Sequence, residues 1–297
     1  MRKVEERFGL SAALTLPVGP ADEIDHARLA AHARWCLDHG CDSVTAFGTT
    51  GEGASVGLAE RERVFAAFAA ARIAGGDVVG GIAASAVTEA AGQALMALDF
   101  GCRALLLPPP FYFKGVGDAG LFAWFARLFE ALGGAARGVI LYNIPSVTQV
   151  PLSLELVGRL RTAFPEVIAG VKDSSGDWPY TERLLAGHGD LAVMIGDERH
   201  LAEGVRRGAQ GAISGLANVC PETLVPMVRE GRGDRRVERL VDELLKHPVI
   251  PAVKALVAHR TGDDAWLAVR PPLISLSAAD ARRLGSFYDT IFAAEAA

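Results

Sequence analysis

Short apolar segments alternate with amphipathic segments along most of the chain. Eight runs of apolar and β-branched residues are each followed by a stretch whose apolar positions recur with a helical period. The runs carry little polar alternation, as expected for strands of a parallel sheet that helices cover. The expected strands are residues 12–18, 43–48, 78–83, 104–108, 138–143, 167–172, 191–196 and 212–216; the expected helices are residues 26–39, 58–75, 88–100, 118–133, 153–163, 178–187, 198–207 and 221–230.

Residues that favour helix ends stand where several of these helices should begin and end. Asp25, Thr88 and Ser153 precede expected helices and are predicted to cap them, and Pro221 suits a first helical turn. Glycines follow three expected helices, where the chain often needs a left-handed residue. These glycines are Gly40, Gly101 and Gly208.

Eight strand–helix units predict an α/β fold, a closed (β/α)8 or TIM barrel. The rival is an open doubly wound sheet, which usually has a glycine fingerprint after its first strand, and residues 17–20 (Pro-Val-Gly-Pro) offer none. Residues 235–297 follow another pattern, with helices expected at 236–246, 251–260 and 278–294. We therefore predict a barrel with the active site over residues 1–234 and a helical segment, 235–297, packed on it.

Composition excludes several classes of protein. The net charge is −5 and the basic residues are scattered, so no nucleic-acid partner is expected. Residues 1–7 lack the apolar core of a signal peptide, and no apolar run approaches the length of about 20 residues that spans a membrane. We expect a cytoplasmic protein without a membrane partner. Four cysteines without CxxC spacing are expected to be free thiols: Cys36, Cys41, Cys102 and Cys220.

Lys172 is the first candidate for chemistry, because it closes the apolar run 167–171 and should lie in the mouth of the barrel. Burial disfavours a cation, so such an amine becomes available as a nucleophile that forms an imine with a ketone. A structural lysine paired with Asp173 is the alternative, and position alone leaves the two open.

Tyr142 ends the preceding strand, so its phenol should reach the same cavity and move protons during imine formation. The turn after the second strand, residues 48–51, offers small residues and backbone N–H groups that can hold a carboxylate. The Thr50 hydroxyl could join the proton chain. The rest of the turn does not form a phosphate loop, because Lys-Ser/Thr is absent.

A metal-dependent barrel would place several His, Asp or Glu residues at strand ends. Only Asp173, Asp197 and Glu198 stand there, and the histidines fall mostly within expected helices. We therefore expect neither a metal site nor a cofactor.

Three motifs taken together resemble the dihydrodipicolinate synthase and N-acetylneuraminate lyase family, whose members are pyruvate-dependent class I aldolases. They are residues 48–52 (Gly-Thr-Thr-Gly-Glu), 142–145 (Tyr-Asn-Ile-Pro) and 170–173 (Gly-Val-Lys-Asp), in family order and spacing. The resemblance covers nearly the whole chain, and the combination is highly specific.

The resemblance implies a role for each matching residue. Lys172 matches the Schiff-base lysine and Tyr142 the proton-relaying tyrosine. The backbone N–H groups of Thr49 and Thr50, next to Gly48, match the binding site of the pyruvate carboxylate, and the Thr50 hydroxyl matches the relay. Tyr112 matches a tyrosine that contributes to the active site of a neighbouring subunit, and Ile213 matches a residue that lines the pyruvate pocket. The resemblance also implies a homotetramer built as a dimer of dimers.

The departures from the family pattern concern the substrate. Val147 stands where the synthases have an arginine that binds the substrate carboxylate, and a valine cannot form a charge-assisted hydrogen bond. Residues 196–198 (Gly-Asp-Glu) are one residue tighter than the sugar-binding stretch of sialic-acid lyases, and residues 215–216 (Gly-Leu) stand near the serine of those enzymes. These departures argue against both the synthase function and the sialic-acid lyase function.

The expected function is that of a Schiff-base carbon–carbon lyase acting on pyruvate and an aldehyde, or cleaving a sugar-derived 2-oxo acid. Two other enzymes stay open, namely 4-hydroxy-tetrahydrodipicolinate synthase and a dehydratase of 2-oxo-3-deoxy sugar acids. A 2-oxo acid-binding protein without turnover is the non-enzyme alternative.

Overall fold

The computed structural model describes residues 7–293 and contains a closed barrel of eight parallel strands, which confirms the predicted fold. Each strand pairs with its neighbour in sequence, and β8 closes the barrel against β1. The strands are β1 (Gly9–Ala13), β2 (Ser43–Ala46), β3 (Val78–Gly81), β4 (Ala104–Leu107), β5 (Val139–Asn143), β6 (Ile168–Asp173), β7 (Ala192–Ile195) and β8 (Gly211–Ser214).

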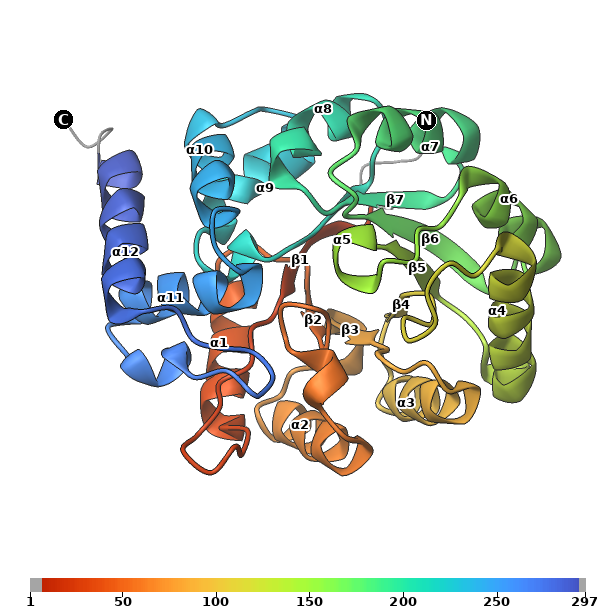
Figure 1. The fold of residues 1–297 in the computed structure, drawn as a ribbon, viewed down its shortest axis with the longest axis horizontal. Coiled ribbons are helices and arrows are strands. Elements are labelled where there is room, and N and C mark those ends of the chain that lie inside the picture. The colour runs from red at the N-terminus through yellow and green to blue at the C-terminus, as the bar shows by residue number, and fades with distance from the viewer. Residues whose placement is uncertain (1–6, 294–297) are drawn as a thin grey trace.

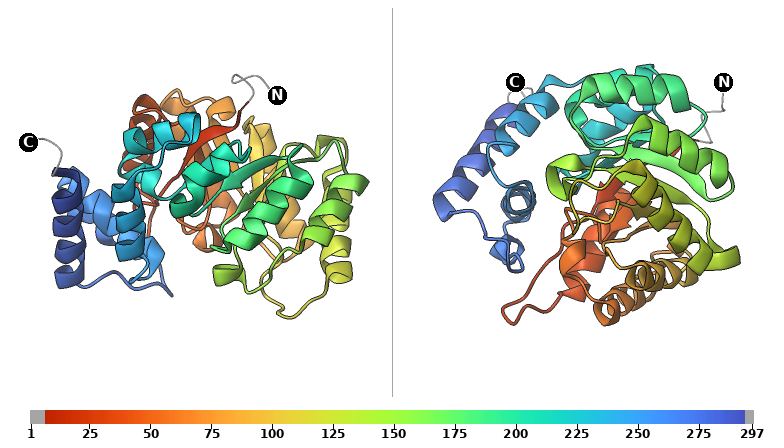
Figure 2. Two further views of the ribbon diagram at one scale, coloured as in Figure 1. Left: turned by 90° about the horizontal axis from the view of Figure 1, so that it is seen from above. Right: turned by 45° about the vertical axis from the view of Figure 1, so that its right-hand side comes forward.

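Helices surround the strands, as Figure 1 and Figure 2 show. A short helix that the sequence pattern did not predict, α5 (Pro145–Thr148), follows β5. The helices outside the barrel are α1 (His26–Asp38), α2 (Leu58–Ala70), α3 (Val87–Asp99), α4 (Asp118–Leu132), α6 (Leu154–Ala163), α7 (Trp178–His188), α8 (Leu201–Arg206) and α9 (Pro221–Glu230).

Several sequence predictions about element ends were wrong. The first strand begins at Gly9 and ends at Ala13, whereas residues 12–18 were expected; it extends to earlier residues because the barrel accepts the polar Ser11, whose hydroxyl lies 2.8 Å from that of Thr45. Thr88 does not cap α3, which begins one residue earlier after Ala86 and has no side-chain cap. The predicted caps Asp25 and Ser153 are confirmed by hydrogen bonds from the backbones of α1 and α6.

The last part of the chain forms α10 (Arg235–Leu244), α11 (Val249–Thr261) and α12 (Ala278–Ala293). These helices lie together on one side of the barrel, at the left of Figure 1, where α12 contacts both α10 and α11. Residue 294, expected in the last helix, lies outside the described residues, as do residues 1–6 of the segment considered for a signal peptide.

The four cysteines are free and buried, as expected. Burial raises the pKa of the Cys41 and Cys102 thiols to about 12. Between residues 7 and 293, no helix has the length and apolar character needed to cross a membrane.

Candidate active site

The carboxyl ends of β5 and β6 place a phenol beside an amine inside the barrel. Tyr142 and Lys172 are partners in the strand register, so their side chains leave the sheet on the same face. The Lys172 Nζ lies 3.3 Å from the Tyr142 hydroxyl and 4.3 Å from the centre of its ring. Only 5% of Lys172 and 4% of Tyr142 is exposed, so the pair sits in a nearly dry environment.

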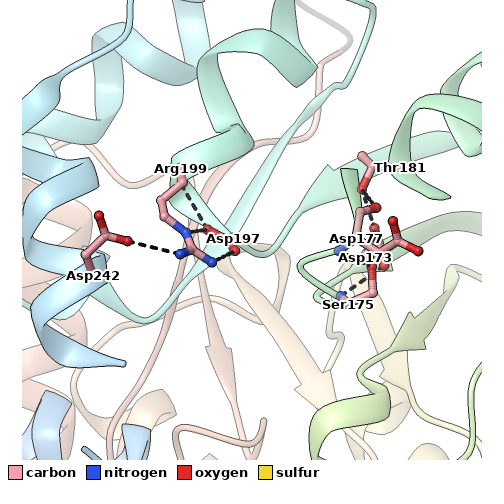
Figure 3. A network of polar contacts seen from close by, with 7 residues as sticks. All are labelled: Asp173, Ser175, Asp177, Thr181, Asp197, Arg199 and Asp242. Carbon is pink, nitrogen blue, oxygen red and sulfur yellow. Dashed lines mark hydrogen bonds and ion pairs between the residues drawn. The ribbon is translucent and has the colours of Figure 1, made fainter. Parts of the chain in front are cut away.

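Asp173, the next residue along β6, points to the opposite face, toward α7. Its carboxylate accepts hydrogen bonds from Asn143 Nδ2 at 2.9 Å and Thr181 Oγ1 at 2.6 Å, and from the Ser175 backbone N–H and hydroxyl at 3.1 Å each. Figure 3 shows Asp173 grouped with Ser175 and Thr181. Because Asp173 is fully engaged there, the alternative of a Lys172–Asp173 ion pair is excluded.

The turn after β2 brings Thr49 and Thr50 to the same mouth. The Thr49 Oγ1 lies 3.4 Å from the Tyr142 hydroxyl, whereas the Thr50 Oγ1 faces Gly215 after β8, where an added methyl group would lie 3.6 Å from it. The sequence expectation that the Thr50 hydroxyl continues the chain from Tyr142 is therefore corrected, because the hydroxyl in contact is that of Thr49. Adjacent residues of a tight turn point apart, and sequence spacing could not say which one meets the phenol.

Some backbone N–H groups of this turn have no hydrogen-bond acceptor within residues 7–293. The N–H groups of Gly51, Glu52 and Gly53 bond back to the carbonyls of Gly48 and Thr49. Within residues 7–293, the N–H groups of Thr49 and Thr50 donate to no acceptor. Two free, adjacent N–H groups at the mouth of a cavity can bind a carboxylate.

A cavity of about 290 Å³, here called the lysine cavity, joins these groups. Lys172, Tyr142, Thr49, Thr50 and Ile213 all line it, so the structure brings together five of the seven predicted site residues. Its remaining wall includes residues of α10 and α11, which sequence reasoning treated only as an appendage: Val241, Leu244, Val249 and Val253. A buried amine, a phenol and carboxylate-binding N–H groups around one cavity can form an imine with a 2-oxo acid.

The side of the lysine cavity next to β7 is charged. The guanidinium of Arg199 donates two hydrogen bonds to the Asp197 carboxylate, at 3.0 and 2.7 Å, and a third to the carboxylate of Asp242 on α10, at 3.0 Å (Figure 3). Burial alone would raise the pKa of Asp197, but the bonds and charge of Arg199 hold that pKa below its ordinary value. The buried Glu198 accepts a 2.5 Å bond from Ser214, and burial raises its pKa.

The two other predicted residues lie outside the lysine cavity. Gly48 lines a second cavity of about 260 Å³, called here the apolar cavity, which shares Thr49, Tyr142, Ile144 and Val147 with the first. Tyr112 follows β4 and is 75% exposed, stacked edge-on against the exposed Phe113. Within residues 7–293, Tyr112 is not among the residues that line the cavity holding Lys172.

Comparisons with known proteins agree with this geometry. Residues 7–289 match the model of the dihydrodipicolinate synthetase family. A DapA-like lyase of Chloroflexus aurantiacus is 33% identical over 97% of this chain and 98% of its own, and a 4-hydroxy-tetrahydrodipicolinate synthase of Alkalilimnicola ehrlichii is 33% identical over 80% of each. The crystal structure of dihydrodipicolinate synthase from Agrobacterium tumefaciens is 54% identical, covers 96% of this chain and 100% of its own, and superposes with a TM-score of 0.95. The chain belongs to the dihydrodipicolinate synthetase family and is a lyase.

Proposed function

We propose that the enzyme forms a Schiff base between Lys172 and a 2-oxo acid such as pyruvate, and uses it to make or cleave a carbon–carbon bond. The observation that carries the proposal is the Lys172 amine, buried in the lysine cavity and in contact with a phenol instead of a carboxylate. A lysine that serves only structure would need a charged partner at that depth.

The mechanism follows from the neighbours of the amine. The unprotonated form of the Lys172 amine attacks the keto carbon, and the keto oxygen leaves as water with one proton from that nitrogen and one from the Tyr142 phenol, which gives the protonated imine. The N–H groups of Thr49 and Thr50 hold the carboxylate, so the keto carbon faces Nζ. The protonated imine then withdraws electrons while the adjacent carbon gives a proton to the Tyr142 oxygen, and the resulting enamine adds to an aldehyde, whose oxygen takes up that proton. Water then releases the product from Lys172. Cleavage of a longer 2-oxo acid is the reverse sequence.

Borohydride trapping tests the proposal. Incubation with pyruvate and borohydride should add the reduced pyruvyl group to the peptide that contains Lys172, as mass spectrometry would show. A protein that turns over its substrate without any mass increase on this peptide would contradict the Schiff base. Binding of pyruvate without turnover of any aldehyde would instead favour the binding-protein alternative.

4-hydroxy-tetrahydrodipicolinate synthesis is the second candidate, favoured by the names of the relatives in Agrobacterium tumefaciens and Alkalilimnicola ehrlichii. Against it stands Val147, which is 57% exposed and lines the shared mouth of both cavities without offering a charge. A screen of pyruvate with aspartate semialdehyde and other aldehydes, beside aldonic and aldaric 2-oxo acids, separates synthase, aldolase and dehydratase. Activity with aspartate semialdehyde equal to that with the best sugar substrate would favour the synthase.

We also propose that the active enzyme is a homotetramer, built from dimers in which Tyr112 reaches the neighbouring subunit's site. The exposed rings of Tyr112 and Phe113 lie on the loop after β4, and the apolar cavity beside Thr49 and Tyr142 could take such a ring. Light scattering after size exclusion should give a tetramer. A Tyr112→Ala variant that remains fully active as a monomer would contradict this arrangement.

A further inference from the structure

The turn that carries Thr49 and Thr50 has a backbone conformation that it would not hold by itself. Phe47 and Glu52 bracket it, and both are non-glycine residues in the left-handed region, with φ of 60° and 51°. Side chains rarely adopt such angles unless the surroundings impose them. A Cβ at Gly51 would lie 2.7 Å from the Leu14 carbonyl oxygen, so the turn is also pressed against the segment that follows β1.

Glu52 is held from the C-terminal part of the chain. One carboxylate oxygen lies 2.5 Å from Lys254 Nζ on α11, and the other accepts the backbone N–H of Arg270 at 2.8 Å. The side chains of Glu52 and Lys254 are both 0% exposed. Burial lowers the pKa of Lys254, and the charge of Glu52 opposes that shift. The ion pair is therefore shielded from water and salt.

Helix α11 faces the reacting groups as well. Val249 and Val253 line the lysine cavity, while Ile250 lines the apolar cavity. Val253 directly precedes Lys254 in the sequence. The same helix thus closes the cavity with its valines and fixes the turn with its lysine. A second buried cation, Arg61, donates to the Gly53 carbonyl at 2.8 Å, so the turn is held from both sides.

We propose that Lys254 is a positioning residue for the reaction. Acting through Glu52, it fixes the backbone N–H groups of Thr49 and Thr50 and the hydroxyl of Thr49. Lys254 does not touch the substrate. The inference rests on the proposed function, since its consequence is the alignment of a 2-oxo acid carboxylate with Lys172. It also assigns a catalytic purpose to the C-terminal helices.

Three variants of the full-length chain test the proposal. Lys254→Met removes the cation, the double variant Glu52→Gln with Lys254→Met removes both charges, and Glu52→Asp keeps both charges but shortens the reach of the carboxylate. Lys246→Met is the matched control, because Lys246 is a surface lysine paired with Glu243. The measurements are thermal stability, the rate of imine trapping against pyruvate concentration, and hydrogen exchange of the peptide that covers residues 47–56.

We expect each folded variant to require at least about tenfold more pyruvate for half-maximal trapping, with faster exchange in residues 47–56. The double variant should regain stability relative to Lys254→Met, since no charge stays buried alone, but should keep the defect in pyruvate binding. The control should match the wild type in all three measurements.

The proposal is overturned if any one of the three variants folds and then traps pyruvate and exchanges these amides as the wild type does, because the geometry of the pair would then serve stability alone. Glu52→Asp provides this readout even if the more severe variants do not fold. A wild-type protein that traps no pyruvate would count against the proposed function, while hydrogen exchange would still decide whether Lys254 holds the turn.

Discussion

Lys172 and Lys254 are two buried lysines of one chain, and their surroundings set them apart. Lys254 is fully buried and pairs with Glu52 at 2.5 Å, whereas Lys172 contacts the neutral phenol of Tyr142 at 3.3 Å. The partner, more than the burial, decides what each amine can do. A carboxylate keeps the ammonium charged and fixed, while a phenol leaves an amine free to react and can exchange protons with it.

Replacing Lys172 gives the largest effect we expect. Lys172→Ala should abolish trapping of pyruvate by borohydride while the fold is retained, because no buried carboxylate loses its partner. Peptide mapping of the trapped wild-type protein distinguishes the two lysines, since the adduct should lie on Lys172 and never on Lys254. An adduct on Lys254 would contradict the different reactivity that we assign to the two lysines.

Removing the phenol hydroxyl should have the next largest effect. Tyr142→Phe should slow turnover by about 10²–10⁴-fold, the range for one acid–base group. Tyr180→Phe is the matched control, because the Tyr180 hydroxyl donates to the Leu152 carbonyl at 2.8 Å, outside the lysine cavity. A loss of less than about fivefold in Tyr142→Phe would reduce the role of the phenol to packing.

The same replacement at the two lysines should separate them by stability. Lys254→Met should cost about 3–5 kcal/mol, because it leaves the Glu52 carboxylate buried and unpaired. Lys172→Met, which strands no charge, should change the free energy of unfolding far less. Urea denaturation of both variants measures the difference, and equal losses would show that the two environments are alike.

His32 extends the comparison to a buried base with a neutral partner. Its Nε2 lies 2.9 Å from Asn218 Oδ1, and burial lowers the pKa of His32 to about 4 from 6.5. Between these values the unfolded chain binds more protons than the folded one, so stability should fall as the pH falls from about 6.5 to about 4, by up to about 3 kcal/mol.

Comparing urea denaturation of the wild type and His32→Gln across this pH range isolates the contribution of His32. The variant should lose the corresponding part of the slope. A parallel pH dependence in the two proteins would contradict the view that His32 is kept neutral by its surroundings.

The local pattern of the sequence was enough to predict the barrel and the positions of the polar side chains at its strand ends. Parallel strands buried on both faces must be apolar, so Lys172 at the end of such a strand stands out, and strand alternation sends Asp173 to the other face. The caps Asp25 and Ser153 were predictable for the same reason, because they depend only on adjacent residues.

The features that could be predicted from the sequence are therefore those that depend on neighbours along the chain, namely the strands, most helices, and the positions of Lys172 and Tyr142 at strand ends. Three features became visible only in the folded chain: the contact of Thr49 with Tyr142, the part of α10 and α11 in the wall of the lysine cavity, and the pairing of Lys254 with Glu52 across 202 positions. The physical reason is that a turn's conformation and a buried ion pair depend on atoms brought together by folding, and no local pattern records them.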